Sequence, residues 1–184
     1  LHFAVPAALS DMLRSGLVDV SLVPVIDLAR SQGAWEQVSD ACIGSEHETL
    51  TVRVFSRVSP ERMTVLHVDG DSHTSVVLAR LIWRYWYKRP IDIVPLPSNG
   101  LQKECESVLL IGDKVVTTPM ADFEHTVDLG AAWRRWTGLP FVFAVWAAPV
   151  GRPDNARLGS ILNSARDRGI SQATRVAEEY APVR

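Results

Sequence analysis

The segment between residues 63 and 86 constrains the fold of this chain most strongly. An apolar run, Met63 to Val68, leads into the polar turn Asp69-Gly70-Asp71-Ser72-His73-Thr74-Ser75, and a helix-like run, Val76 to Trp86, leads out of it. The order strand, turn, helix places backbone N–H groups and short hydroxyls at the N-terminus of a helix. A helix end of this kind favours an anion such as a carboxylate or a phosphate.

The same turn also has an ordinary structural interpretation. Asp, Ser and Thr are common helix caps, and Gly is a common turn residue. One cap is enough for a helix, whereas four capping residues crowd this helix end: Asp71, Ser72, Thr74 and Ser75. On this segment alone a plain cap is the more common explanation, and the redundancy is what supports a binding site.

Strand-like and helix-like patterns alternate along the rest of the chain. Short apolar runs predict strands at residues 18–25, 50–58, 63–68, 91–95, 108–111 and 141–147, and helical spacing predicts helices after Pro6, at 75–87, at 128–136 and in the tail. This alternation predicts an α/β fold with a largely parallel sheet. Such sheets bind ligands at the carboxyl ends of their strands. Three of these ends carry suggestive residues, namely Ser21 to Pro24, the 69–75 turn and Gly112-Asp113.

The composition excludes several classes of partner. The 184 residues are 47% hydrophobic and carry a net charge of −2, so a substantial core can form but no basic field holds nucleic acid. No apolar run approaches the roughly 20 residues that cross a bilayer, so we expect no membrane partner. Cys42 and Cys105 lie far apart without a CxxC spacing, which predicts free thiols in a reducing compartment.

The sequence lacks the motifs of the commonest reaction chemistries. The five histidines do not pair at metal-ligand spacing, and neither GxSxG, GxxxxGK[ST] nor GxGxxG occurs. We therefore expect no metal and no nucleotide cofactor. The available groups are hydroxyls, backbone N–H groups and the carboxylate of Asp113, an inventory suited to a carboxylated small molecule.

Several segments together resemble one family. They are Val5-Pro6-Ala7-Ala8-Leu9, Ser15-Gly16-Leu17-Val18-Asp19-Val20-Ser21-Leu22, Asp71-Ser72-His73-Thr74-Ser75, Leu109-Leu110-Ile111-Gly112-Asp113, and Asp128-Leu129-Gly130 through Trp133 to Thr137-Gly138-Leu139-Pro140-Phe141-Val142-Phe143-Ala144-Val145-Trp146-Ala147. In this order they resemble the chorismate dehydratases of the futalosine route to menaquinone. The resemblance extends over most of residues 5 to 150.

The resemblance implies an α/β, two-lobed fold like that of the type 2 periplasmic binding proteins, with the ligand between the lobes. We expect residues 1–58 and 121–184 to form a discontinuous lobe 1, and residues 59–120 to form lobe 2. The family's N-terminal strand has no counterpart in this sequence. Lobe 1 is therefore expected to be incomplete at its N-terminus.

The resemblance also implies a cytoplasmic lyase without metal or cofactor, which dehydrates chorismate to 3-[(1-carboxyvinyl)oxy]benzoate. The substrate contacts that carry over are Ser21, Thr51, Ser72, Thr74, Ser75, Gly112 and Asp113. No catalytic residue is assigned, and the protein is expected to be a monomer or a homodimer. Two alternatives stay open: a cyclase-like enzyme of the same pathway that acts on a futalosine derivative, and a non-catalytic solute-binding protein for a small carboxylate.

Overall fold

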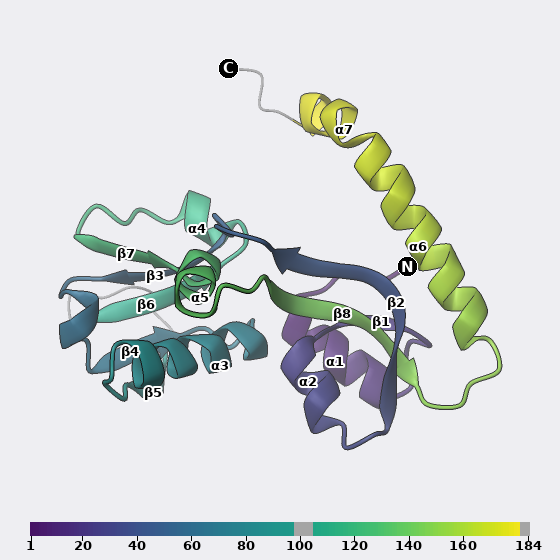
Figure 1. The fold of residues 1–184 in the computed structure, drawn as a ribbon, viewed down its shortest axis with the longest axis horizontal. Helices are drawn as coiled ribbons and strands as arrows, with labels where there is room; N and C mark the ends of the chain where they lie inside the picture. Colours follow the sequence, from purple (N-terminus) through teal and green to yellow (C-terminus); the bar gives the residue numbers. More distant parts are fainter. Residues whose placement is uncertain (98–104, 181–184) are drawn as a thin grey trace.

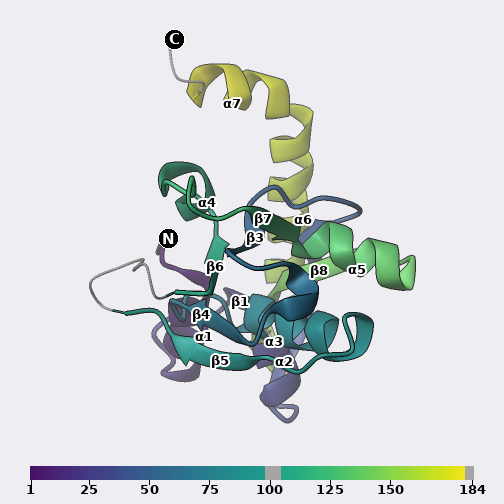
Figure 2. The same cartoon turned by 90° about the vertical axis from the view of Figure 1, so that its left-hand side faces the viewer.

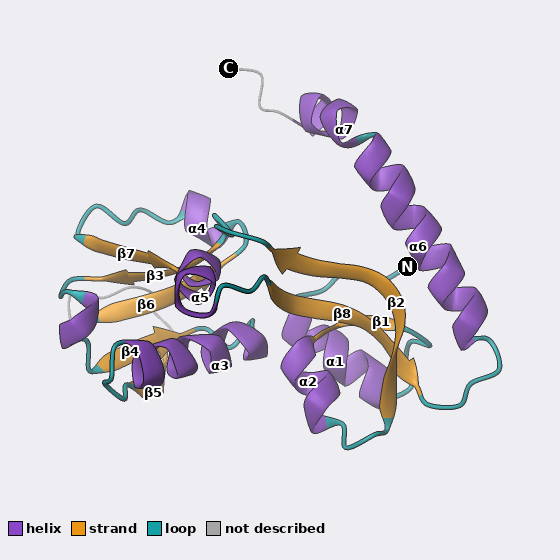
Figure 3. Cartoon of the chain, in the orientation of Figure 1, coloured by secondary structure: helices purple, strands orange, loops and turns teal. Residues whose placement is uncertain are grey.

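The computed structural model describes residues 1–97 and 105–180, which form two β-sheets with helices packed around them (Figures 1 and 3). The chain crosses between the sheets in two places. The first crossing joins β2 (Trp35–Ser45) to β3 (Val52–Ser56), and the second joins α5 (Leu129–Thr137) to β8 (Phe141–Pro149). Each sheet therefore contains segments that are distant in the sequence.

The smaller sheet has three strands in the order β1-β8-β2, where β1 is Ser21–Pro24, and both pairings are antiparallel. Helices α1 (Pro6–Arg14) and α2 (Val25–Arg30) pack near it, and a small core forms around Leu13, Val23 and Ala147. Helix α6 (Asn155–Ser171) starts against β2, and α6 and α7 (Ala173–Tyr180) extend away from both sheets (Figure 1).

The larger sheet has the strand order β5-β4-β6-β3-β7. Its further strands are β4 (Val65–Val68), β5 (Asp92–Pro95), β6 (Ser107–Ile111) and β7 (His125–Asp128). Strand β4 is parallel to β5 and β6, whereas β3 is antiparallel to β6 and β7. The remaining elements of this part are η1 (Pro60–Arg62), α3 (His73–Leu81), the π-helical turn η2 (Ile82–Trp86) and α4 (Lys114–Thr117) (Figure 2).

The main core lies on the side of the larger sheet that α3, η2 and α5 cover. Trp83, Met63 and Leu66 are fully buried there, and each buried side chain of this size stabilises the fold by about 2 kcal/mol or more. The indole of Trp83 donates to the carbonyl of Pro60 at 2.9 Å, so its polar atom is satisfied as well. Phe143 of β8 belongs to the same cluster, which joins the core to the second crossing.

The strand pairing corrects two expectations. The prediction of a largely parallel sheet is wrong, because β4 takes part in both of the parallel pairings among the described strands and the others are antiparallel. The lobe boundaries also differ from those expected at residues 58 and 121. Strands β3 and β7 hydrogen-bond within the five-stranded sheet, so this sheet begins before residue 58 and extends beyond residue 121. These pairings join residues that are distant in sequence, which local patterns do not report.

Candidate functional site

The predicted polar turn at residues 69–75 lies where the helices of the two sheets meet. The N–H of Ala7, at the start of α1, donates to the carbonyl of Asp71 at 3.3 Å. The N–H of Ile26, at the start of α2, donates to Oγ1 of Thr74 at 3.5 Å. Since α2 also packs against α3, the turn belongs to the contact between the two parts of the molecule (Figure 1).

The structure brings the three predicted hydroxyls of this turn together. Ser72 is the N-cap of α3: its Oγ accepts from the N–H of Ser75 at 3.2 Å and donates to the Ser75 hydroxyl at 2.8 Å. Thr74 and Ser75 are buried, and their hydroxyl oxygens accept hydrogen bonds from protein groups. Among the described residues, the N–H groups of His73 and Thr74 have no hydrogen-bond partner, and no hydrogen bond is donated by the hydroxyls of Thr74 and Ser75. The groups left for an anion are therefore backbone donors of the first helical turn and these two O–H groups.

Lys114 binds the acidic side of the turn. Its Nζ lies 2.6 Å from Oδ2 of Asp69 and also contacts the carboxylate of Asp71. Hydrogen bonds to these carboxylates, Asp69 first, raise the pKa of Lys114 above its ordinary value. This contact connects the turn after β4 to the turn after β6, which carries Gly112 and Asp113.

Thr51, Gly112 and Asp113 lie at this same edge of the larger sheet. The N–H of Gly112 donates to the carbonyl of Thr51 at 2.8 Å, and Gly112 has a φ of +60°, a conformation that favours glycine. Oγ1 of Thr51 donates to the carbonyl of Thr49 at 3.3 Å. Because β4 and β6 are parallel neighbours, their carboxyl ends place these residues beside the 69–75 turn.

Ser21 is separated from the other predicted contacts. It is a buried residue of β1 whose Oγ donates to the carbonyl of Leu9 at 3.1 Å. It also lines a mostly apolar hollow of about 700 Å³, to which Phe3, Trp146 and Leu158 contribute. Among the described residues, no hydrogen bond joins Ser21 to the 69–75 turn.

The sequence reasoning missed a polar cluster that crosses between the two parts of the molecule. Asp27 of α2 is buried, and its Oδ2 lies 2.7 Å from both Oγ of Ser10 and Nδ1 of His73. Arg30 lies 3.9 Å from the other oxygen of Asp27. One signal could have found this residue, because Asp27 lies two residues after the predicted strand at residues 18–25, near the strand end where ligands bind.

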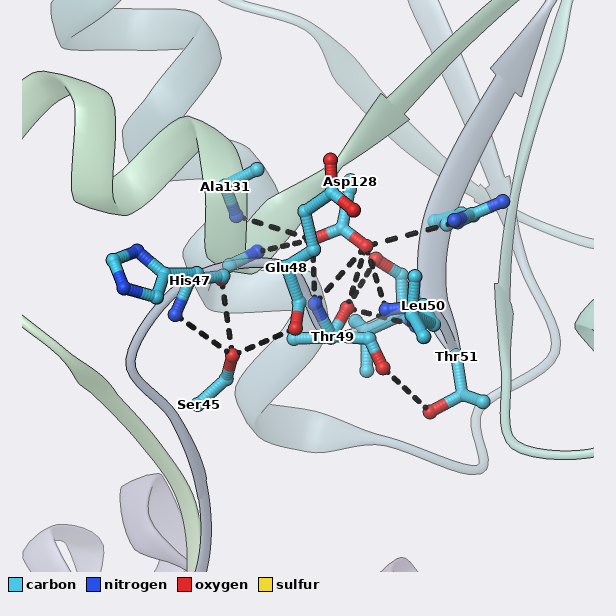
Figure 4. Close-up of polar contacts among 11 residues, drawn as sticks. Ser45, His47, Glu48, Thr49, Leu50, Thr51, Asp128 and Ala131 are labelled. Carbon is cyan, nitrogen blue, oxygen red and sulfur yellow. Dashed lines mark hydrogen bonds and ion pairs between the residues drawn. The ribbon is translucent and has the colours of Figure 1, made fainter.

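Asp128 holds the first crossing between the sheets (Figure 4). Its carboxylate accepts from the N–H groups of Gly130 and Ala131 at the start of α5, and from the N–H groups of Thr49 and Leu50 in the crossing. Burial raises the pKa of Asp128, but these bonds and the Thr49 hydroxyl outweigh it, so the pKa lies below its ordinary value. Asp128 therefore links Thr49 and Leu50 of the first crossing to the N-terminus of α5.

The described residues contain neither a metal-binding cluster nor a membrane-spanning helix. No group of three or more His, Cys, Asp or Glu side chains gathers there in a way that could hold a metal ion. Within residues 1–97 and 105–180, no helix combines the length and the apolar character needed to cross a bilayer.

A family model described as menaquinone biosynthesis matches residues 1–183. The chain belongs to this menaquinone-biosynthesis family. Its curated relatives include a chorismate dehydratase of Thermus thermophilus, which is 29% identical over 197 residues, covering 98% of this chain and 72% of the relative. The resemblance found in the sequence is confirmed at the level of the family.

Solved structures show that this member of the menaquinone-biosynthesis family shares its fold with solute-binding proteins. Protein AF1704 from Archaeoglobus fulgidus matches with a TM-score of 0.65 at 13% identity, covering 97% of this chain and 69% of that one. The periplasmic aliphatic sulphonate binding protein SsuA from Escherichia coli matches with a TM-score of 0.54 at 14% identity, covering 96% of this chain and 63% of SsuA. The predicted periplasmic-binding-protein-like α/β fold is confirmed.

Proposed function

We propose that this protein is a lyase that dehydrates chorismate to 3-[(1-carboxyvinyl)oxy]benzoate in menaquinone biosynthesis. The observation that carries the proposal is the alignment of 98% of the chain with a chorismate dehydratase. We assign the reaction to the futalosine route and to the cytoplasm. The free cysteines Cys42 and Cys105 are compatible with a reducing compartment.

The chemistry of the substrate suits the groups at the 69–75 turn. Chorismate carries two carboxylates, and the unpaired N–H groups of His73 and Thr74 lie at the positive end of α3. We propose that one carboxylate binds there, beside Thr51, Gly112 and Asp113. Ser72 then acts by capping the helix, whereas the hydroxyls of Thr74 and Ser75 only accept from protein groups and keep their O–H donors.

The reaction itself needs little help from acidic or basic side chains. The bond from the ring carbon to its hydroxyl breaks, an adjacent ring carbon loses its proton, and the electron pair of that C–H bond forms the double bond that completes the aromatic ring. Water is the other product. We propose that the enolpyruvyl carboxylate of the substrate accepts the proton and passes it to the departing hydroxide, which leaves as water, while the protein orients the substrate for this transfer.

The test is incubation of the purified protein with chorismate, followed by aromatic absorbance and by product mass. We expect a new aromatic species that has lost one water molecule. As a control, Asp122→Asn, which changes an exposed carboxylate outside the proposed contacts, should convert chorismate like the unsubstituted protein. Unchanged chorismate in the presence of folded protein contradicts the proposal.

The likeness to solute-binding proteins favours one second candidate, a receptor for a small carboxylate that carries out no reaction. Tight chorismate binding without any conversion distinguishes the receptor from the lyase. The third class, a cyclase-like enzyme of the same pathway, is distinguished by conversion of a cyclisable futalosine derivative in place of chorismate.

A further inference from the structure

A buried carboxylate fixes the orientation of the histidine in the 69–75 turn. Asp27 of α2 is 5% exposed, and its Oδ2 lies 2.7 Å from Nδ1 of His73, the first residue of α3. Since an ionised carboxylate only accepts hydrogen bonds, Nδ1 carries a proton directed at Asp27. The hydroxyl of Ser10 on α1 donates to the same oxygen. Nε2 is therefore the ring atom left for a ligand.

The ring of His73 is available at the helix end. Its side chain is 42% exposed, and its Nε2 has no partner among the described residues. The neighbouring hydroxyls of Thr74 and Ser75 belong to buried residues, and Ser72 donates its own hydroxyl to Ser75. His73 therefore offers the partly exposed side-chain atom of this turn beside buried hydroxyls and backbone N–H groups.

The local charge makes protonation of Nε2 relevant to anion binding. Helix α1 contributes the neutral Ser10, and the charged side chains on the turn, on α2 and at α4 are, among the described residues, Asp27, Arg30, Asp69, Asp71, Asp113 and Lys114. Four carboxylates and two cations leave two uncompensated negative charges while His73 is neutral. A carboxylate ligand adds to that charge, and a proton on Nε2 offsets part of it.

We propose, on the basis of the dehydratase function above, that His73 binds one substrate carboxylate through Nε2–H as an imidazolium. Asp27 is the positioning residue that holds the ring. Substrate binding is then coupled to the uptake of a proton by His73. In this account His73 determines the affinity for an anionic substrate, and the enolpyruvyl carboxylate removes the proton from the substrate's own six-membered ring.

Calorimetry with the reaction product tests this directly, because 3-[(1-carboxyvinyl)oxy]benzoate keeps both carboxylates and is not consumed. Titrations at about pH 6.5, 7.5 and 8.5, each in two buffers of different ionisation enthalpy, report the protons taken up. For the unsubstituted protein we expect proton uptake on binding and an affinity that falls by up to about tenfold for each pH unit.

The variants separate the proposed contact from a structural role. His73→Gln is expected to abolish proton uptake and to weaken product binding about tenfold at the lowest pH, because the charged donor is lost. His73→Arg keeps a cation at every pH, so its affinity should become independent of pH. Asp27→Asn should reduce proton uptake, and the matched control His125→Gln, on β7, should leave it unchanged.

Steady-state kinetics with chorismate complete the test. His73→Gln is expected to raise KM about tenfold and to change kcat by less than about threefold. Unchanged proton uptake in folded His73→Gln overturns the inference, and so does a large loss of kcat at unchanged KM, which identifies a base. If the unsubstituted protein does not convert chorismate, the proposed function fails instead.

Discussion

Replacement of Asp128 by Asn tests how the first crossing between the sheets is held. Oδ1 of Asp128 accepts from the N–H groups of Gly130 and Ala131 at the start of α5 and from the Thr49 N–H at 3.0 Å, and Oδ2 accepts from Leu50 at 2.8 Å and from the Thr49 hydroxyl at 3.0 Å. Asparagine keeps a single acceptor oxygen, so with that oxygen in the place of Oδ1 it loses the two bonds that Oδ2 accepts. Loss of two bonds to a charged acceptor, at about 1.5 kcal/mol each, predicts a loss of about 3 kcal/mol.

Urea unfolding at neutral pH measures this difference in the free energy of unfolding. Asp128→Ala also removes the helix cap, which adds about 1 kcal/mol to the loss. Asp122→Asn, an exposed carboxylate without a side-chain hydrogen bond among the described residues, serves as the control and should change stability by less than about 0.5 kcal/mol. A loss below about 1 kcal/mol in Asp128→Asn would refute the assignment of Asp128 as the group that fixes the crossing.

The pH dependence gives a second check on the same residue. The pKa of Asp128 in the folded protein lies below its ordinary value of 3.8. The carboxylate therefore stabilises the fold fully above about pH 3.8, and this contribution is lost as the pH falls through the folded-state pKa. The stability difference between the unsubstituted protein and Asp128→Asn should narrow in that acidic range. A constant difference down to full protonation would contradict the hydrogen-bonding account.

Four more substitutions have defined outcomes in the same unfolding assay. Gly130→Ala should cost about 2 kcal/mol or more, because its Cβ would lie 2.6 Å from a side-chain atom and 2.7 Å from a backbone oxygen of the crossing. Gly159→Ala should displace α6 from β2, since its Cβ would meet the Val38 carbonyl, whereas Gly169→Ala on the same helix has open space and should stabilise by about 0.5–1 kcal/mol. Glu106→Gln should cost about 1 kcal/mol above pH 4.5 and progressively less in acid, because burial raises the pKa of Glu106 but hydrogen bonds from two backbone N–H groups outweigh it. Equal effects of the two α6 glycine substitutions, or a pH-independent effect of Glu106→Gln, would contradict these assignments.

Most local elements of the larger sheet could be predicted from the sequence because their signals are local. The strand, turn and helix around residues 63–86 are present, with the helix divided into α3 and the π-helical turn η2. Strand β7 is not among the predicted strands, because it is four residues long and only Val127 in it is buried. Strand β2 is not among them either, because Trp35–Ser45 is polar at many positions, is mostly exposed or half-exposed, and shifts its register against β8 twice. The strand directions, and the place of β3 in the larger sheet, depend on pairings between strands that are distant in the sequence. The pattern of a single segment does not contain this information.

The candidate site was predicted in part for the same reason. The carboxyl-end rule placed Gly112-Asp113 and the 69–75 turn at one edge, as the parallel pairing of β4 and β6 requires. The third strand end, Ser21 to Pro24, belongs to the other sheet, and Thr51 was carried over from the family resemblance. The contact between Asp27 and His73 joins residues 46 positions apart on different helices, so no motif marks it. Whether the predicted residues bind substrate stays a prediction that the binding and kinetic measurements address.

The measurement that tests the central claim most directly is the fate of chorismate in the presence of the purified protein. Mass spectrometry of the reaction mixture, with aromatic absorbance recorded in parallel, follows both substrate and product. The account predicts conversion of chorismate to an aromatic dicarboxylate that has lost one water molecule, at a rate that increases with protein concentration. Chorismate recovered intact after binding to the folded protein would contradict it.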